Sequence, residues 1–155
     1  MTIYLVRHAK AGERRTWTDD DMLRPLSKAG WAQAEALAVR LAGHEPSVML
    51  SSPYVRCVQT LEPLGALIDC EVVIEQRLCE HEPFEPVLDL LSEVPNHAVL
   101  CSHGDIIPAT IAALERRGME IVSEADWRKA SVWVIKRSKK GRFSKAKVWP
   151  PPPRG

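Results

Sequence analysis

The chain has 155 residues, a net charge of +1, 45% apolar residues and 26% charged residues. This size and balance fit one globular domain and argue against a uniformly basic nucleic-acid-binding protein. No apolar run approaches the roughly 18–20 residues of a membrane span, and residues 1–6 lack the basic start and cleavage site of a signal peptide. We therefore predict a cytoplasmic protein with a single domain over residues 1–149 and a proline-rich tail over residues 150–155.

Charge is distributed unevenly along the chain. Residues 127–155 contain ten Lys and Arg and no Asp or Glu, whereas the rest contains eleven basic and twenty acidic residues. We expect this basic end to be a solvated surface, with binding of an acidic partner, RNA or a membrane surface as the alternative. The oligomeric state has no signature in the sequence.

Apolar runs alternate with amphipathic segments. In chain order, the patterns predict a strand at 3–6, a loop at 9–25, a helix capped by Ser27 that runs to Leu41 and closes at Gly43, a strand at 48–50, a helix from Pro53 to about Ile68, a strand at 72–74, a loop at 76–85, a short helix at 86–91, a strand at 98–101 and a helix over about 106–117. Residues 131–137 and 143–149 flank a turn and predict a hairpin. This alternation predicts an α/β fold, a three-layer α/β/α sandwich with a mostly parallel central sheet.

Basic side chains follow three of the predicted strands. Arg7 and His8 come directly after the first strand, Arg56 follows the second within the first turn of a helix, and His103 and Gly104 follow the fourth. Ligand sites of such sheets lie beyond the carboxyl ends of the strands. We therefore expect these residues to meet at one edge of the sheet.

This set of side chains suits a phosphate or carboxylate ligand. Two guanidinium groups bind a tetrahedral dianion, and backbone N–H groups around Gly104 add donors. A neutral histidine held by one ring nitrogen can attack phosphorus with the other, and nearby arginines lower its pKa. A carboxyl group on the loop after the third strand, Glu80 or Glu82, can protonate the leaving oxygen. Such a site requires no metal, because the cationic side chains stabilise the charge.

Four segments resemble the histidine phosphatase superfamily, the branch that includes cofactor-dependent phosphoglycerate mutase. They are Leu5-Val6-Arg7-His8-Ala9, Arg24-Pro25-Leu26-Ser27-Lys28-Ala29-Gly30, Ser51-Ser52-Pro53-Tyr54-Val55-Arg56-Cys57-Val58-Gln59-Thr60 and Ser102-His103-Gly104. They occur in the family's order, and the second is most similar to the small SixA-type phosphohistidine phosphatases. The resemblance implies a phosphoglycerate mutase-like fold.

The resemblance also implies roles. His8 would become phosphohistidine, and Arg7, Arg56 and His103 would bind the phosphoryl group, with His103 also taking part in catalysis. Glu80, in Leu78-Cys79-Glu80, matches the position of the family's proton donor, although SixA-type members often lack that acid; Glu82 is the alternative. No metal or other cofactor is implied.

The predicted function is a metal-independent phosphatase acting on a phosphomonoester, a phosphoanhydride or protein phosphohistidine. The substrate would be a phosphorylated small molecule or a phosphoprotein. A nucleotide-directed phosphatase and a non-catalytic phosphate-binding module are the alternatives. The chain departs from the family pattern at Ala9, where a glycine is usual, and at Lys10, which with Arg14 and Arg15 makes the mouth of the site more cationic. Trp17 is a candidate substrate contact.

Overall fold

The computed structural model describes residues 1–153, whose strands form one sheet with the order β3-β2-β4-β1-β6-β7-β5. The strands are β1 (Thr2–Arg7), β2 (Met49–Ser51), β3 (Val72–Ile74), β4 (Ala98–Ser102), β5 (Glu120–Ile121), β6 (Val132–Arg137) and β7 (Phe143–Trp149). Neighbours pair in parallel in β1/β4, β2/β3, β2/β4 and β5/β7, and antiparallel in β1/β6 and β6/β7. The prediction of a mostly parallel sheet with a C-terminal hairpin is confirmed.

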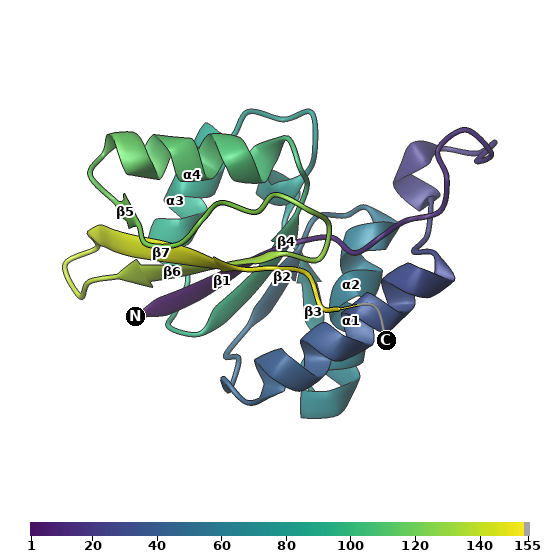
Figure 1. The fold of residues 1–155 in the computed structure, drawn as a ribbon, viewed down its shortest axis with the longest axis horizontal. Helices are drawn as coiled ribbons and strands as arrows, with labels where there is room; N and C mark the ends of the chain where they lie inside the picture. Colours follow the sequence, from purple (N-terminus) through teal and green to yellow (C-terminus); the bar gives the residue numbers. More distant parts are fainter. Residues whose placement is uncertain (154–155) are drawn as a thin grey trace.

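Four helices cover the two faces of the sheet. They are α1 (Lys28–Ala42), α2 (Val55–Ile68), α3 (Glu85–Glu93) and α4 (Ile106–Arg116). The pair α1 and α2 lies on one face, and α3 and α4 lie on the other (Figure 1). Among the described residues, no helix is both long and apolar enough to cross a membrane. The three-layer α/β/α prediction is confirmed.

Strand β1 shows why the sheet needs helices on both faces. Its side chains alternate, so Ile3 and Leu5 pack in the core beneath α3 and α4, while Tyr4 and Val6 pack in the core beneath α1 and α2. A strand buried on both faces is apolar throughout instead of alternating with polar residues. The short apolar run at the start of the chain therefore occupies the centre of the sheet.

The helix caps and short turns show which local predictions from the sequence agree with the structure. Ser27 caps α1, since its hydroxyl accepts a hydrogen bond from the N–H of Gly30 at 3.1 Å. Helix α2 begins at Val55, two residues after the predicted start at Pro53. The two predicted loops contain 3-10 helices at Asp21–Leu23 and Gln76–Leu78, which side chains of the preceding acidic residues cap. Strand β5 was not predicted, because two residues are too few to show a periodic pattern.

The chain after β7 runs without helix or strand from residue 150 to 153. Trp149 holds its start: its ring lies 3.7 Å from the guanidinium carbon of Arg40 on α1 and also packs against Tyr4. This contact directs the prolines toward α1 (Figure 1). The last two residues of the predicted tail, 154 and 155, lie outside the described residues.

Candidate active site

The register of the sheet brings the two histidines together. Strands β1 and β4 are parallel neighbours, and Arg7 pairs with Ser102. The next residues of the two strands are His8 and His103, so both histidines leave the same edge of the sheet. The N–H of His8 donates to the carbonyl of Ser102 at 3.1 Å, and the two rings are 5.4 Å apart between centroids. Strand β2 lies on the other side of β4 and delivers Arg56 through the start of α2.

A pocket of about 240 Å³ opens at this edge, and we call it the edge pocket. Its lining residues are Arg7, His8, Arg14, Arg24, Arg56, Glu80, His81, Gly104, Asp105 and Lys129. Five of the six site residues predicted from the sequence line it, and the sixth, His103, is buried directly against His8. Glu82 is exposed and does not line the pocket. The structure therefore places Glu80, and not Glu82, with the other candidate residues.

The surroundings of His8 fix its ring orientation and keep the imidazole neutral, as a nucleophilic histidine requires. Its Nδ1 lies 2.8 Å from the backbone carbonyl of Ala9. A carbonyl can only accept, so Nδ1 carries the proton and Nε2 carries the lone pair. Burial, and after it the charges of Arg56 and Arg7, lower the pKa of His8 to about 3. The predicted direction of this shift is confirmed, although burial contributes more than the arginines.

His103 is buried and also neutral. Burial, followed by the charges of His8 and Arg56, lowers its pKa to about 2. Its Nε2 lies 2.8 Å from the Ser52 hydroxyl, whose oxygen already accepts a hydrogen bond from the N–H of Tyr54. We assign the imidazole proton to Nδ1, because this atom faces the Glu80 carboxylate, and the Ser52 hydroxyl then donates to Nε2. Within residues 1–153 this Nδ1 forms no hydrogen bond, and its contact with a Glu80 carboxylate oxygen is 3.4 Å long, which leaves the N–H available to a ligand.

Arg56 is the most buried cation of the site, with 1% of its surface exposed. Its guanidinium group donates to the Asp21 backbone carbonyl at 2.9 Å, to the Asp21 carboxylate at 3.1 Å and to the Glu80 carboxylate at 2.8 Å. The other carboxylate oxygen of Glu80 lies 3.4 Å from Nδ1 of His103. Glu80 therefore links the buried arginine to the buried histidine.

Arg7 depends on the glycine that follows His103. The Arg7 guanidinium group donates to the carbonyl of Trp127. A Cβ atom added at Gly104 would lie 2.6 Å from the guanidinium carbon of Arg7, which is closer than such atoms approach. The glycine at this position therefore lets the Arg7 guanidinium group lie where it does, in addition to any N–H group that it offers to an anion.

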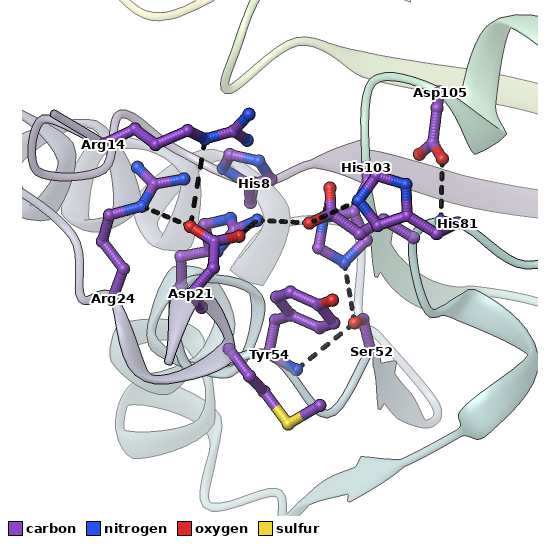
Figure 2. A network of polar contacts seen from close by, with 12 residues as sticks. His8, Arg14, Asp21, Arg24, Ser52, Tyr54, His81, His103 and Asp105 are labelled. Carbon is purple, nitrogen blue, oxygen red and sulfur yellow. Dashed lines mark hydrogen bonds and ion pairs between the residues drawn. The ribbon is translucent and has the colours of Figure 1, made fainter. Parts of the chain in front are cut away.

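Asp21 is a site residue that the sequence did not reveal (Figure 2). Its carboxylate accepts from Arg24 at 2.9 Å and from Arg56 at 3.1 Å, and lies 3.9 Å from Arg14. Burial acts to raise the pKa of Asp21, but the hydrogen bonds and charges of Arg24 and Arg56 lower it to about 2. Three aspartates occur in succession at positions 19–21, and only the 3-10 helix determines which of them turns inward.

The remaining motif residues hold the loop after His8. The hydroxyl of Thr60 accepts from the N–H of Ala9 at 2.9 Å, and the amide oxygen of Gln59 accepts from the N–H of Leu26 at 2.9 Å. A Cβ atom at Gly30 would lie 1.8 Å from the carbonyl oxygen of Lys10. Residues of α1 and α2 therefore contact the loop after His8 directly. The φ angle of Ala9 is not positive, so an alanine methyl group is tolerated at this position.

The charge of the edge pocket suits an anion. Arg7, Arg14, Arg24, Arg56 and Lys129 line it, against the carboxylates of Glu80 and Asp105. In the part of the chain that the structure describes, no three His, Cys, Asp or Glu side chains are grouped to hold a metal ion. Four arginines and a lysine around a small polar cavity bind phosphate-like groups through charge-assisted hydrogen bonds.

Comparisons with known proteins agree with this geometry. An "8-oxo-(d)GTP phosphatase" of Mycolicibacterium smegmatis is 34% identical over an alignment of 143 positions that covers 88% of this chain and 44% of that protein. The chain thus spans less than half the length of this curated relative. The structure of a protein histidine phosphatase SixA complexed with tungstate has a TM-score of 0.75 at 21% identity and covers 94% of this chain and 96% of its own. A mycobacterial glucosyl-3-phosphoglycerate phosphatase has a TM-score of 0.72 at 20% identity, covering 97% and 99%.

These two structural likenesses show a shared fold, and the family is shown by the sequence itself. The profile of the histidine phosphatase superfamily (branch 1) matches residues 3–83. This range contains Arg7, His8, Arg56 and Glu80, and the fold adds His103 and Gly104 to them. The chain belongs to the histidine phosphatase superfamily (branch 1).

Proposed function

We propose that the protein is a phosphatase that hydrolyses a phosphorylated substrate through a phosphohistidine on His8. The observation that carries this proposal is the state of the His8 ring. Its Nδ1–H is bound to a backbone carbonyl, its pKa is low, and it lines a small pocket together with Arg7 and Arg56. A neutral imidazole nucleophile beside cations that hold a phosphoryl group is the arrangement that phosphoryl transfer to histidine needs.

In the first step, Nε2 of His8 attacks phosphorus, so that a P–N bond forms and the P–O bond to the leaving group breaks. Arg7, Arg56 and Nδ1–H of His103 hold the non-bridging oxygens. The leaving oxygen keeps the electron pair of the broken bond and takes a proton from the Glu80 carboxyl group, which acts as the general acid. In the second step, water attacks phosphorus, Glu80 takes its proton, and His8 leaves with the electron pair of the P–N bond.

The relatives support a phosphorylated small molecule or a phosphoprotein as substrate. One relative is an 8-oxo-(d)GTP phosphatase and a structural neighbour is a protein histidine phosphatase. The same pocket could also hold a phosphorylated partner without turnover. That binding function differs from the proposal in one measurable respect, since it leaves His8 unphosphorylated.

The test compares two histidine variants of the full chain, His8→Asn and His97→Asn. The control histidine lies in a turn with a φ of 67°, which asparagine tolerates. We expect turnover of an aryl phosphate in EDTA for the wild type and for His97→Asn, and a loss of about 10³-fold or more for His8→Asn. Rapid quenching without acid should trap an acid-labile phosphoprotein in the wild type and in His97→Asn, and none in His8→Asn. Phosphate binding without turnover at any pH from acid to neutral would contradict the proposal and favour the binding module.

A further inference from the structure

A second cavity adjoins the edge pocket, and we call it the basic groove. It has a volume of about 520 Å³ and is lined by Arg7, Lys10, Gln33, Arg128, Lys129 and prolines 151–153. Arg7 and Lys129 line both cavities. The two cavities therefore meet at these two side chains, which a ligand with its phosphoryl group at His8 would pass to reach the groove.

Lys129 is the cation at this junction. Within residues 1–153 its ammonium group forms neither a hydrogen bond nor an ion pair. Its side chain is exposed, and partial desolvation followed by the charges of Arg7, Arg24 and Arg56 lowers its pKa. Placing a lysine without a counter-ion among three arginines is unfavourable in the free protein. A bound anion would offset the repulsion between Lys129 and the arginines, so this position favours a ligand with negative charge.

The other cations of the groove divide into paired and unpaired groups. Arg128 is paired with Asp126, with a shortest contact of 2.6 Å, so its charge is already compensated. Lys10 is exposed, and its side chain has no acidic partner among the described residues. The uncompensated charge of the groove thus lies at Lys129 and Lys10, on the side that continues from Arg7.

Part of the groove's wall is apolar. The prolines of residues 151–153 form this part, and Trp149 fixes where they start through its contact with Arg40. Proline has no backbone N–H, so this wall offers no donors to an anion. The groove therefore combines a cationic side with an apolar side, and it has room for a further phosphate together with the group that carries it.

We propose that the basic groove binds a second phosphate, joined by one oxygen to the phosphoryl group at His8, and that the substrate is a phosphoanhydride such as a nucleoside diphosphate. This inference rests on the proposed function and names its substrate class. The bond that breaks is the P–O bond between the bridging oxygen and the phosphorus attacked by His8. The leaving phosphate keeps that electron pair and accepts the proton from Glu80, and Lys129 and Lys10 hold it.

The first test measures binding and does not depend on turnover. Pyrophosphate and orthophosphate are titrated by calorimetry, in EDTA, into the His8→Asn protein. We expect pyrophosphate to bind about 10- to 100-fold more tightly, and Lys129→Gln to remove most of this difference. The matched control is Lys139→Gln in the turn between β6 and β7, which should alter neither affinity. Equal affinities for the two anions, or an equal loss of both in Lys129→Gln, would overturn the proposal.

The second test measures turnover of ADP and of an aryl phosphate by the protein with His8 intact. Lys129→Gln should lower kcat/KM for ADP by about 10-fold more than for the aryl phosphate, because only ADP places a second phosphate in the groove. An equal fall in kcat/KM for ADP and for the aryl phosphate in Lys129→Gln would contradict a phosphoanhydride substrate. A glutamate-rich peptide that displaces pyrophosphate at lower concentration than ADP does would instead assign the groove to an acidic protein. Pyrophosphate binding that needs Lys129, in a protein without turnover of either substrate, would reject the proposed function alone.

Discussion

At the scale of single residues, the chemistry of this site depends on how one buried arginine is shared. Arg56 donates to both Asp21 and Glu80, and the two carboxylates come from different loops. A phosphoryl dianion entering the edge pocket competes with both for the same guanidinium group. The two acids therefore affect activity in different ways: Glu80 gives a proton to the leaving group, and Asp21 acts through its negative charge.

The contribution of Glu80 to kcat is expected to increase as the leaving group becomes poorer. Glu80→Gln should lower kcat by about 10²- to 10⁴-fold for an alkyl phosphate, whose leaving oxygen needs a proton. The loss should be far smaller for a nitrophenyl phosphate, whose leaving group departs as an anion. Steady-state kinetics on the two substrates measure this split. The control is Glu82→Gln, and an equal loss in that variant would assign the proton donor to the neighbouring acid.

Asp21 is expected to weaken anion binding. Asp21→Asn keeps an oxygen that accepts from Arg24 and Arg56 but removes the negative charge, so orthophosphate should bind about 3- to 10-fold more tightly. Asp19→Asn, a short distance along the same loop, is the matched control and should bind orthophosphate as the wild type does. Titration calorimetry of all three proteins tests this. Weaker binding in Asp21→Asn would show that its main role is to hold Arg56 in place.

At the scale of secondary-structure elements, glycine contacts set how closely the strand ends and helices approach. The turn from β4 into α4 passes so near Arg7 that a side chain at Gly104 would have to displace the Arg7 guanidinium group. At Gly43, just after α1, the nearest atom to an added Cβ is a carbonyl oxygen at 3.7 Å, which is ordinary contact. The two glycines thus offer a matched comparison.

Gly104→Ala is expected to displace the Arg7 guanidinium group and to lower kcat/KM by about 10²-fold, by misplacing one of the two arginines that hold the phosphoryl group. Gly43→Ala should leave kcat/KM unchanged. Thermal unfolding measured alongside separates the two effects, because a global fold defect would lower Tm in proportion to the lost activity. Wild-type kinetics in Gly104→Ala would show that Arg7 can move without consequence.

At the scale of the whole molecule, two buried neutral histidines make stability depend on pH. The pKa values of His8 and His103 are lowered to about 3 and about 2, whereas in the unfolded chain both titrate near the ordinary value of about 6.5. Between these values the unfolded chain binds more protons than the folded one. The free energy of unfolding must therefore fall as pH falls below about 6.5, and the contribution of these groups is constant above it.

This dependence is measurable by urea unfolding at several pH values from about 7 to about 5. His8 and His103 should together contribute a slope approaching two protons at the acidic end of this range, and His8→Asn should reduce the slope by about one. His97→Asn serves as the control for removing a histidine. An unchanged slope in His8→Asn would mean that the folded protein protonates His8 as readily as the unfolded chain does.

Most of the fold and much of the site were predictable from the sequence, because their signals are local. Apolar runs such as residues 3–6 and the capping serine at position 27 specify elements through their own periodicity and hydrogen bonds. Parallel pairing then requires that residues directly after neighbouring strands meet. For that reason Arg7, His8, Arg56 and His103 could be placed at one edge, and the resemblance to the family then favoured Glu80 over Glu82 as the acid.

The sequence by itself determined the α/β class, the order of elements, the family and the residues that gather at one edge of the sheet. Only the tertiary structure decided that Asp21 shares Arg56, that Glu80 and not Glu82 enters the pocket, and that Lys129, without a partner in residues 1–153, lines a groove together with prolines 151–153. The physical reason is that these contacts join loops far apart in the chain. The directions in which these side chains point depend on turns and packing, and neither produces a periodic pattern in the sequence.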